Sequence, residues 1–377
     1  MVQVTYDTAR PYPYQMKILL AGDWRWPIYE QAFSRALSEL GQEVIPFHFK
    51  NFFAGPVGYC QSAVPLPGPA LLKLNRRLLE TAKSRRPDVV LVWRGTHVLP
   101  RTIARLNRAG ITTVSYNNDD PFVPRRRSHT PWHQAFLWHW YLQALRYYRY
   151  NFFYRKINVT EALQAGAAHA AVLKPYFIPW RDRPVTLTAE EQERFGCDVV
   201  FVGHYEPDGR VDSLRALVEA GFSVRLFGDS TWNRSVLGKD LCGYFGKVTP
   251  ANGEDYAKAL CGAKVCLAFL SKHNRDTYTR RCFEIPACGR VMLAERTDDL
   301  LCMFEEGRDA CFFSHGDELL IKAKWLLENP CISEAIAESG RMRVLADGHD
   351  VKSRASEFLS SVTAVTQPTT WISPGEP

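Results

Sequence analysis

Short apolar runs alternate with amphipathic stretches along the chain, and the alternation occurs twice. In the first half, apolar residues recur with helical period between the runs, and Gly41 and Gly110 follow two of these stretches as helix C-caps. Strands alternating with helices predict parallel pairing, with helices on both faces of the sheet. The predicted strands are 16–23, 43–49, 88–95 and 111–117, and the predicted helices are 28–40, 70–85 and 99–109.

The second half repeats the pattern after a polar, proline-containing segment. We therefore expect an α/β protein of two Rossmann-like doubly wound domains facing an interdomain cleft. The predicted strands are 197–206, 223–229, 264–270, 291–294 and 309–314. The predicted parts are an N-terminal domain (1–182) with an aromatic and basic insertion (122–156), a linker (183–196), a C-terminal domain (197–349), a C-terminal helix (350–362) and a disordered tail (363–377).

Composition narrows the class of protein. The chain has 377 residues, of which 46% are hydrophobic, enough for two domains. Its net charge of +7 fits an anionic small molecule, an anionic membrane surface or nucleic acid. None of the ten cysteines forms a CxxC pair, which favours reduced thiols. We see no signal peptide and no apolar run of membrane-spanning length, so we expect a cytoplasmic protein, peripheral at most at the inner membrane face.

The segment 125–156 interleaves Trp, Tyr and Phe with Arg. This composition suits a membrane interface near a lipid-linked acceptor, stacking on nucleic acid, or a partly buried helical insertion on the acceptor side. We favour the buried insertion, keep peripheral membrane contact as the alternative, and do not expect a nucleic-acid partner. His129, His133 and His139 have no acidic residue to complete a ligand set, so we expect no metal.

The stretch "YTRRCFEIPACGRVMLAER" (278–296) places a carboxylate, Glu284, in an apolar segment built for burial. A helix starting near Thr279 would offer free backbone N–H groups to phosphate oxygens, and Arg280 or Arg281 could add charged hydrogen bonds. One turn further, Glu284 could accept from two vicinal hydroxyls. The alternative is an ion pair between Glu284 and Arg281 on the same helix face.

Four stretches carry a resemblance to a known family: "DVVFVGHYEPDGR", "DTYTRRCFEIPACGRVMLAE", "LLCMFEEGRDACFF" and "MRVLADGHDVKSRASEFL". They resemble the CgeB-like glycosyltransferases, which have the two-domain GT-B fold, and the likeness covers most of residues 197–361. The resemblance implies that Glu284 binds the donor ribose and that Asp276, eight residues earlier, faces the donor sugar. For Asp276 a helix N-cap is the alternative.

The resemblance also implies basic residues at the diphosphate. His204 and Arg210 follow the strand that ends at Gly203, where the backbone can approach a ligand closely. GT-B enzymes typically hold no divalent metal, so protein cations must stabilise the leaving diphosphate. Lys272 and His273, after the 264–270 strand, are further donor-side candidates.

The N-terminal domain should supply the acceptor side and a base. Its strand ends carry Gly22, Asp23, Arg94 and His97, and then Asp119 and Asp120. Adjacent acids can raise one another's pKa, which makes Asp119 and Asp120 the candidate bases, with His97 and Asp23 as alternatives. A turn before Pro121 would also explain this pair of acids.

We therefore expect a bacterial glycosyltransferase, hexosyltransferase-like, that needs no bound cofactor. It would move a sugar from a nucleotide-sugar to a glycan, lipid-linked or protein acceptor in surface-polysaccharide assembly, and the two-acid pattern favours retention. The alternatives are a non-catalytic nucleotide- or glycan-binding protein of a surface or spore-like assembly, a nucleotide-sugar epimerase, and a nucleic-acid or membrane-surface module.

Overall fold

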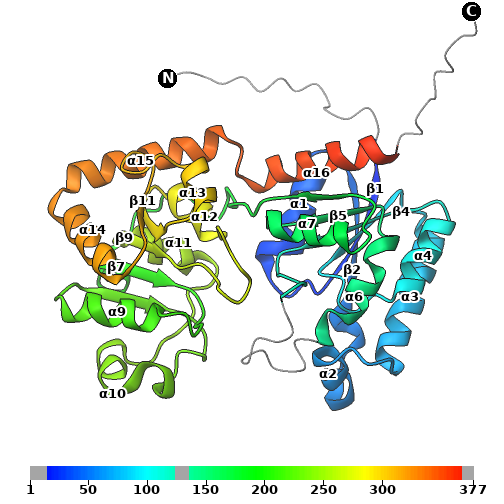
Figure 1. Ribbon diagram of the computed structural model, residues 1–377, viewed down its shortest axis with the longest axis horizontal. Helices are drawn as coiled ribbons and strands as arrows, with labels where there is room; N and C mark the ends of the chain where they lie inside the picture. The colour runs from blue at the N-terminus through cyan, green and yellow to red at the C-terminus, as the bar shows by residue number, and fades with distance from the viewer. Residues whose placement is uncertain (1–14, 124–135, 367–377) are drawn as a thin grey trace, which may run out of the picture. The chain divides into compact units, whose positions relative to one another are not determined.

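The computed structural model describes residues 15–123 and 136–366, which form two compact units. The N-terminal unit is Met1–Lys174 together with Lys352–Pro377, and the C-terminal unit is Pro175–Val351 (Figure 1). Each unit has a parallel sheet covered by helices.

The N-terminal unit contains a six-stranded sheet of order β2-β1-β3-β4-β5-β6, with every strand pair parallel. Strands β1, β3 and β4 are almost entirely buried, as expected of a sheet covered on both faces. The strands are β1 (Lys17–Gly22), β2 (Glu43–His48), β3 (Val89–Trp93), β4 (Thr112–Asn117), β5 (Tyr150–Phe153) and β6 (Ala170–Val172).

Helices of this unit bury one apolar stripe each. In α3 the stripe is Leu71, Leu74, Leu78 and Ala82, which recur at three- and four-residue intervals. The α-helices are α1 (Ala32–Glu39), α2 (Gly55–Ala63), α3 (Pro69–Arg85), α4 (Pro100–Arg108), α6 (His139–Ala144), α7 (Lys156–Gln164) and α16 (Val351–Thr366). A π-helix, η1 (Pro27–Gln31), and two 3-10 helices, η2 (Phe49–Phe52) and η3 (Leu145–Tyr147), complete the unit.

The C-terminal unit contains a five-stranded parallel sheet of order β11-β10-β9-β7-β8. From β7 the chain goes to β8 on one side and then returns to β9 on the other, so the strand order reverses between β7 and β9. In open α/β sheets this reversal point is where ligands bind, at the carboxyl ends of the strands. The strands are β7 (Cys197–Val202), β8 (Val224–Phe227), β9 (Ala263–Ala268), β10 (Val291–Glu295) and β11 (Cys311–Phe313).

Two apolar cores lie on the two faces of this sheet. One includes Phe283 and Leu260 from α12 and α11, and the other includes Leu214 and Leu319 from α9 and α14. The helices are α8 (Ala189–Phe195), α9 (Arg210–Glu219), α10 (Arg234–Phe245), α11 (Glu254–Cys261), α12 (Arg281–Ala287), α13 (Asp298–Met303), α14 (Gly316–Glu328) and α15 (Pro330–Ala346).

The division between the units differs from the predicted linker at 183–196. The structure divides at Lys174 and Pro175, and half of the expected linker is helix α8, opened by a capping box between Thr188 and Glu191. The buried Phe195 packs in the core of the C-terminal unit. The sequence predicts a linker here because the short helix α8 buries one residue, Phe195, and its other residues give the polar composition that is typical of linkers.

The chain beyond 350 also differs from expectation. The helix predicted for 350–362 is α16, which runs to Thr366 and joins the N-terminal unit. Its Phe358 packs against Phe33 and Phe152 with ring centroids 5.6 Å and 5.7 Å apart. Residues 363–366, expected in the disordered tail, are therefore helical, and residues 367–377 lie outside the described chain.

The aromatic segment after Phe122 is not an insertion over the part that the structure describes. Tyr141, Tyr148, Phe152 and Phe153 are buried in the core, and β5 is an interior strand of the sheet. The aromatic residues of 141–153 thus build the unit itself rather than a membrane-facing surface. Residues 124–135, which include His129 and His133, lie outside the described residues.

Candidate functional site

Gly203 directly follows the carboxyl end of β7, and its backbone N–H donates to the Phe227 carbonyl of β8 at 2.9 Å. A Cβ atom on Gly203 would lie 2.7 Å from Cζ of Phe201 and 3.2 Å from Nη1 of Arg281. The Gly203 carbonyl accepts a hydrogen bond of 2.7 Å from the indole N–H of Trp232. Only glycine fits without displacing its neighbours, and the absent side chain lets Arg281 approach the end of β7.

Arg281, the first residue of α12, lies at the point where the strand order reverses. Its Nη2 donates to the Phe269 carbonyl just after β9 at 3.3 Å, and its guanidinium carbon is 5.4 Å from the centre of the Phe201 ring. The Nε atom is buried and has no hydrogen-bond partner in the described chain. Across residues 15–123 and 136–366, no carboxylate lies within ion-pair distance of this guanidinium, so its charge is available to an anion.

The loop between β7 and α9 is folded around a different arginine, Arg210. This side chain is buried and binds Asp208 through Nε at 2.8 Å and Nη2 at 2.5 Å, while Nη1 donates to the His204 carbonyl at 2.6 Å. Arg210 was predicted to bind diphosphate. The structure corrects this, because both ends of its guanidinium hold the loop in shape.

His204 is exposed, and its ring contacts Glu206, an acid that the sequence analysis did not single out. The side chain of His204 is 55% exposed, and Nε2 lies 2.8 Å from Oε1 of Glu206. The other Glu206 oxygen accepts from the Ser271 hydroxyl at 2.9 Å. Burial alone would raise the pKa of Glu206, but His204, Arg210 and Ser271 together lower that pKa to about 2. Glu206 is therefore ionised and orients the His204 ring.

Lys272 and His273 are both exposed after β9. Lys272 lies 2.9 Å from Oε1 of Glu295, whose other oxygen accepts from the Leu270 backbone N–H at 2.6 Å. Glu295 ends β10, so this pair joins the carboxyl ends of two neighbouring strands.

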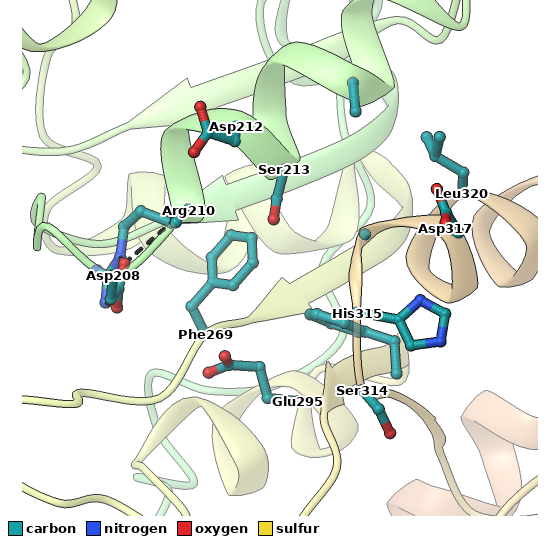
Figure 2. A pocket seen from close by; sticks show the side chains of 14 residues that line it. Asp208, Arg210, Asp212, Ser213, Phe269, Glu295, Ser314, His315, Asp317 and Leu320 are labelled. Carbon is teal, nitrogen blue, oxygen red and sulfur yellow. Dashed lines mark hydrogen bonds and ion pairs between the residues drawn. The ribbon is translucent and has the colours of Figure 1, made fainter.

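A cavity of about 430 Å³ opens beside these strand ends, between the first turns of α9 and α14 (Figure 2). Its size is within the range of small-ligand pockets. Phe269 and Glu295 lie on one side, Arg210 with Asp208 on another, and His315 opposite (Figure 2). Phe269 links the cavity to the switch point, since its carbonyl accepts the Arg281 hydrogen bond.

Glu284 is buried in an ion-pair network. Its Oε1 accepts from Arg280 at 2.8 Å and 3.0 Å and from Nη2 of Arg181 at 2.5 Å, while Oε2 accepts from the Tyr256 hydroxyl at 2.6 Å. Only 3% of the residue is exposed. Burial would raise the pKa of Glu284, but Arg280 and Arg181 outweigh it and lower that pKa to about 2.

This arrangement corrects the predicted ribose contact. Both Glu284 oxygens are occupied by protein donors, and the residue is covered, so we assign it to holding α12 in place. The predicted alternative, an ion pair with Arg281, is also wrong: the partners are Arg280 and Arg181. Asp182 shares Arg181 at 2.6 Å, and burial together with the Glu284 charge raises the pKa of Asp182 to about 6.

Asp276 and Thr279 lie in the turn before α12. Asp276 is half-buried, and its backbone N–H donates to the Ser271 carbonyl at 2.8 Å. The Thr279 carbonyl accepts from Cys282 N–H at 3.0 Å. Arg280, in contrast, is buried, with its guanidinium 4.8 Å from the centre of the Tyr176 ring.

In the N-terminal unit, Arg94 and Asp119 form an ion pair of 2.9 Å at the carboxyl ends of β3 and β4. Arg94 has φ of 66° and Trp24, just after β1, has φ of 56°, conformations that are costly for residues other than glycine. Asp119 raises the pKa of Arg94, and Asp23 adds to this effect, so the two acids lie within electrostatic reach of one guanidinium.

Glu30 is an acid of this region that sequence reasoning missed. It is buried, and its Oε1 accepts from the Asp23 backbone N–H at 2.9 Å. A Cβ at Gly22 would lie 2.4 Å from the same oxygen, which explains the glycine. Burial raises the pKa of Glu30. Glu30 therefore fixes the loop that carries Asp23.

Two predicted bases have structural roles. His97 is buried with Nδ1 2.9 Å from the Thr96 hydroxyl and Nε2 3.0 Å from the Ser62 carbonyl, and burial lowers its pKa. Asp120 is also buried, and its Oδ1 accepts from Asn158 at 2.8 Å and from Phe122 N–H at 2.9 Å. The structure therefore removes His97 and Asp120 from the catalytic candidates and leaves Asp119 and Asp23.

Residues 210–360 match the model of a family described as glycosyl transferase-like. This stretch of the chain is therefore similar to that family. The matched residues start at α9 and end within α16. The prediction of a glycosyltransferase is confirmed as a glycosyltransferase-like match, with no substrate or pathway specified. The narrower CgeB-like assignment has no support beyond the sequence resemblance. No curated protein matches the chain in sequence.

Solved structures share the fold at low identity. HepE from Anabaena, in complex with UDP and glucose, is 14% identical, with 93% of this chain and 100% of that chain covered at a TM-score of 0.61. Sucrose-phosphate synthase from Thermosynechococcus elongatus is 13% identical over 93% of this chain and 99% of its own, with a TM-score of 0.68. A proposed UDP-N-acetylglucosamine 2-epimerase from Listeria monocytogenes is 14% identical over 93% and 96%, with a TM-score of 0.56. The predicted fold, two Rossmann-like domains of the GT-B type, is confirmed.

Within the described ranges, no group of three or more His, Cys, Asp or Glu side chains could hold a metal ion. None of the helices in those ranges is long and apolar enough to cross a membrane.

Proposed function

We propose that this protein transfers a sugar from a nucleotide diphosphate donor to an acceptor hydroxyl, and that Arg281 binds the donor diphosphate. The observation that carries the proposal is the unneutralised guanidinium of Arg281 at the strand-order reversal, inside the glycosyltransferase-like segment. His204, held outward by Glu206, is the second diphosphate ligand. HepE, which shares the fold, is described in complex with UDP and glucose and with UDP-glucose, so we take UDP-sugars as the first donors to test.

In this mechanism the leaving diphosphate gains negative charge as the glycosidic bond to the sugar breaks. A guanidinium already in place stabilises that charge without reorganisation, and its planar fork can bind two phosphate oxygens at once. With both ring nitrogens protonated, His204 donates its Nε2–H to Glu206 and its Nδ1–H to a phosphate oxygen. The adjoining cavity, with Phe269 and Glu295 on its wall, offers an apolar face and a hydroxyl acceptor of the kind that sugars need.

The N-terminal unit supplies the acceptor residues in our proposal. Asp119, paired with Arg94, and Asp23 on the loop fixed by Glu30 are the partly exposed acids at its strand ends. We propose that one of them positions or deprotonates the acceptor hydroxyl. Retention of anomeric configuration, independence of divalent metal, and an acceptor from surface-polysaccharide assembly remain part of the proposal; addition of a chelator and analysis of the product anomer test the first two.

Neighbouring arginines make a matched experiment. Arg281→Ala should weaken UDP binding in calorimetry about 10- to 100-fold, since hydrogen bonds to a charged group are lost. It should hardly change the melting temperature, because Arg281 has no ion-pair partner to strand. Arg280→Ala should leave UDP binding nearly unchanged and lower the melting temperature. The buried carboxylate of Glu284 loses one of its two arginine partners in this variant. Arg234→Ala, an exposed arginine of α10, is the neutral control.

Turnover separates this function from its alternatives. With a panel of UDP-sugars, a transferase releases UDP faster when an acceptor is added, whereas an epimerase converts the donor with no acceptor. A binding protein would hold UDP without either reaction. Unchanged UDP affinity in Arg281→Ala would refute the proposed donor site.

A further inference from the structure

Helices α3 and α4 of the N-terminal unit carry a dense set of exposed cations. The two helices and the residue that ends α3 hold nine lysines and arginines and a single acid, Glu80. All nine are exposed. They are Lys73, Arg76, Arg77, Lys83, Arg85 and Arg86 on α3 and its C-cap, and Arg101, Arg105 and Arg108 on α4.

The cations form stripes on neighbouring helices. On α4, residues 101, 105 and 108 repeat at helical spacing, and Thr102, Ile103 and Leu106 are buried on the opposite side. Asn75 of α3 accepts from the Thr102 hydroxyl and from Leu99 N–H, both at 2.8 Å, which sets α3 beside α4 (Figure 1). The two stripes therefore belong to one layer of the unit, which we call the α3–α4 face.

This face accounts for the basicity of the whole protein. Its excess of eight positive charges compares with a net charge of +7 for all 377 residues. Helix dipoles explain the cations in the last turns of the two helices but not Arg101, which lies in the first turn of α4, where a cation is unfavourable. Glu80 offsets little of the charge, since it is shared by Arg77 at 2.9 Å and Arg76 at 3.6 Å.

Exposed apolar side chains adjoin the cations at the start of α3. Tyr59 of α2, Leu66 and Leu72 are 74%, 54% and 42% exposed. Leu72 is next to Lys73 and one turn before Arg76, and α2 packs against α3. Cations flanked by exposed aliphatic and aromatic residues suit the headgroup region of a bilayer, which attracts both kinds of side chain. A nucleic-acid surface has no use for the aliphatic side chains.

We propose that the α3–α4 face docks the protein on an anionic lipid bilayer, with Leu66, Leu72 and Tyr59 at the headgroup boundary. The proposal is independent of sugar transfer. It places membrane contact on a surface other than the aromatic segment 125–156, whose residues 141–153 are largely buried.

The test is sedimentation of the full chain with vesicles of phosphatidylcholine, alone or mixed with phosphatidylglycerol. We expect binding to the mixed vesicles only, weakened as salt rises from 0.1 M to 0.5 M. Each cation near the surface contributes about fivefold in partitioning, so the triple variant Arg101→Gln, Arg105→Gln, Arg108→Gln should bind about 100-fold more weakly. The matched control, Arg234→Gln, Lys239→Gln, Lys247→Gln, removes three exposed cations from the C-terminal unit and should bind as the unchanged protein does.

A second variant separates lipid from other polyanions. Leu72→Ser should weaken vesicle binding several-fold and leave binding to duplex DNA unchanged. The proposal fails if the protein ignores anionic vesicles, if both triple variants lose binding equally, or if DNA binds more tightly than vesicles and Leu72→Ser has no effect. Circular dichroism of each variant is the control for folding. We expect spectra like that of the unchanged protein, because all substituted side chains are exposed.

Discussion

The Glu284 network allows the sharpest test of the assignments in the C-terminal unit. Replacing Glu284 by Ala removes the acceptor of three arginine N–H bonds and of the Tyr256 hydroxyl. Arg280 would then stay buried, and Arg181 mostly buried, after losing this carboxylate, although Arg181 keeps its ion pair with Asp182 at 2.6 Å. Removing one partner of a buried ion pair costs about 3–5 kcal/mol, because the attraction that offsets the desolvation of the buried charge is lost.

The expected loss is large enough to measure by thermal unfolding. For a unit of this size, 1 kcal/mol corresponds to about 2–4 °C in melting temperature, so Glu284→Ala should lower the transition of the C-terminal unit by about 6–20 °C. Tyr256→Phe removes one neutral donor and should cost about 1–2 kcal/mol. The double variant Glu284→Ala, Arg280→Ala should be less destabilised than the sum of its single variants, since the two side chains contact each other and both substitutions remove the same ion pair.

A pH series adds an independent measurement. The folded-state pKa of Glu284 is about 2, below its ordinary value of 4.5. A lowered acid pKa contributes stability that is present above about pH 4.5 and is lost as the pH falls towards about 2. Glu284→Gln should therefore flatten the acid limb of the stability profile.

Two results would refute this reasoning. If Glu284→Ala left the melting temperature unchanged while abolishing UDP binding, the carboxylate would face the ligand and not the arginines. If Glu284→Gln were as stable as the unchanged protein at pH 7 and showed the same acid limb, the network would not be ionic.

Three further substitutions test neighbouring assignments. Gly203→Ala should weaken UDP binding and cost about 1–3 kcal/mol of stability, because its Cβ would meet Phe201 and press on Arg281; calorimetry and urea titration measure both effects, and unaltered values for both would contradict the close packing. Asp208→Ala should destabilise the C-terminal unit by about 3 kcal/mol by removing the nearer carboxylate of the buried Arg210, which keeps only Glu206 at 3.9 Å, whereas Asp212→Ala, an acid of the first turn of α9, should cost less than about 1 kcal/mol in the same melting experiment. His97→Gln should keep the pH profile of turnover and lower only the melting temperature, and a lost acid limb in that profile would restore His97 as a base.

Much of the fold is predictable from the chain because strands and helices are encoded locally. The apolar runs at 88–95 and 197–206 became β3 and β7, and the parallel order followed from their alternation with helices. The glycine at the end of β7 was also identifiable, since a glycine after a buried strand marks close backbone approach. The boundary of the units was not, because α16 returns to the N-terminal unit through Phe358, a contact with residues that are far away in sequence.

The sequence by itself determined the two parallel-sheet units, the glycosyltransferase-like segment and the neighbourhood of the site, since each rests on short-range periodicity and on motifs a few residues long. Only the tertiary structure decided which charges are neutralised. Arg280 and Arg281 are adjacent, yet about 100° of helical rotation turns one towards Glu284 and the other towards the end of β7. The second arginine on Glu284, Arg181, is 103 residues away in sequence. The pairing of Asp208 with Arg210 and of Glu206 with His204 likewise depends on how the side chains pack. No local pattern carries that information, because ion pairing depends on which side chains the folded chain brings within about 4 Å of one another.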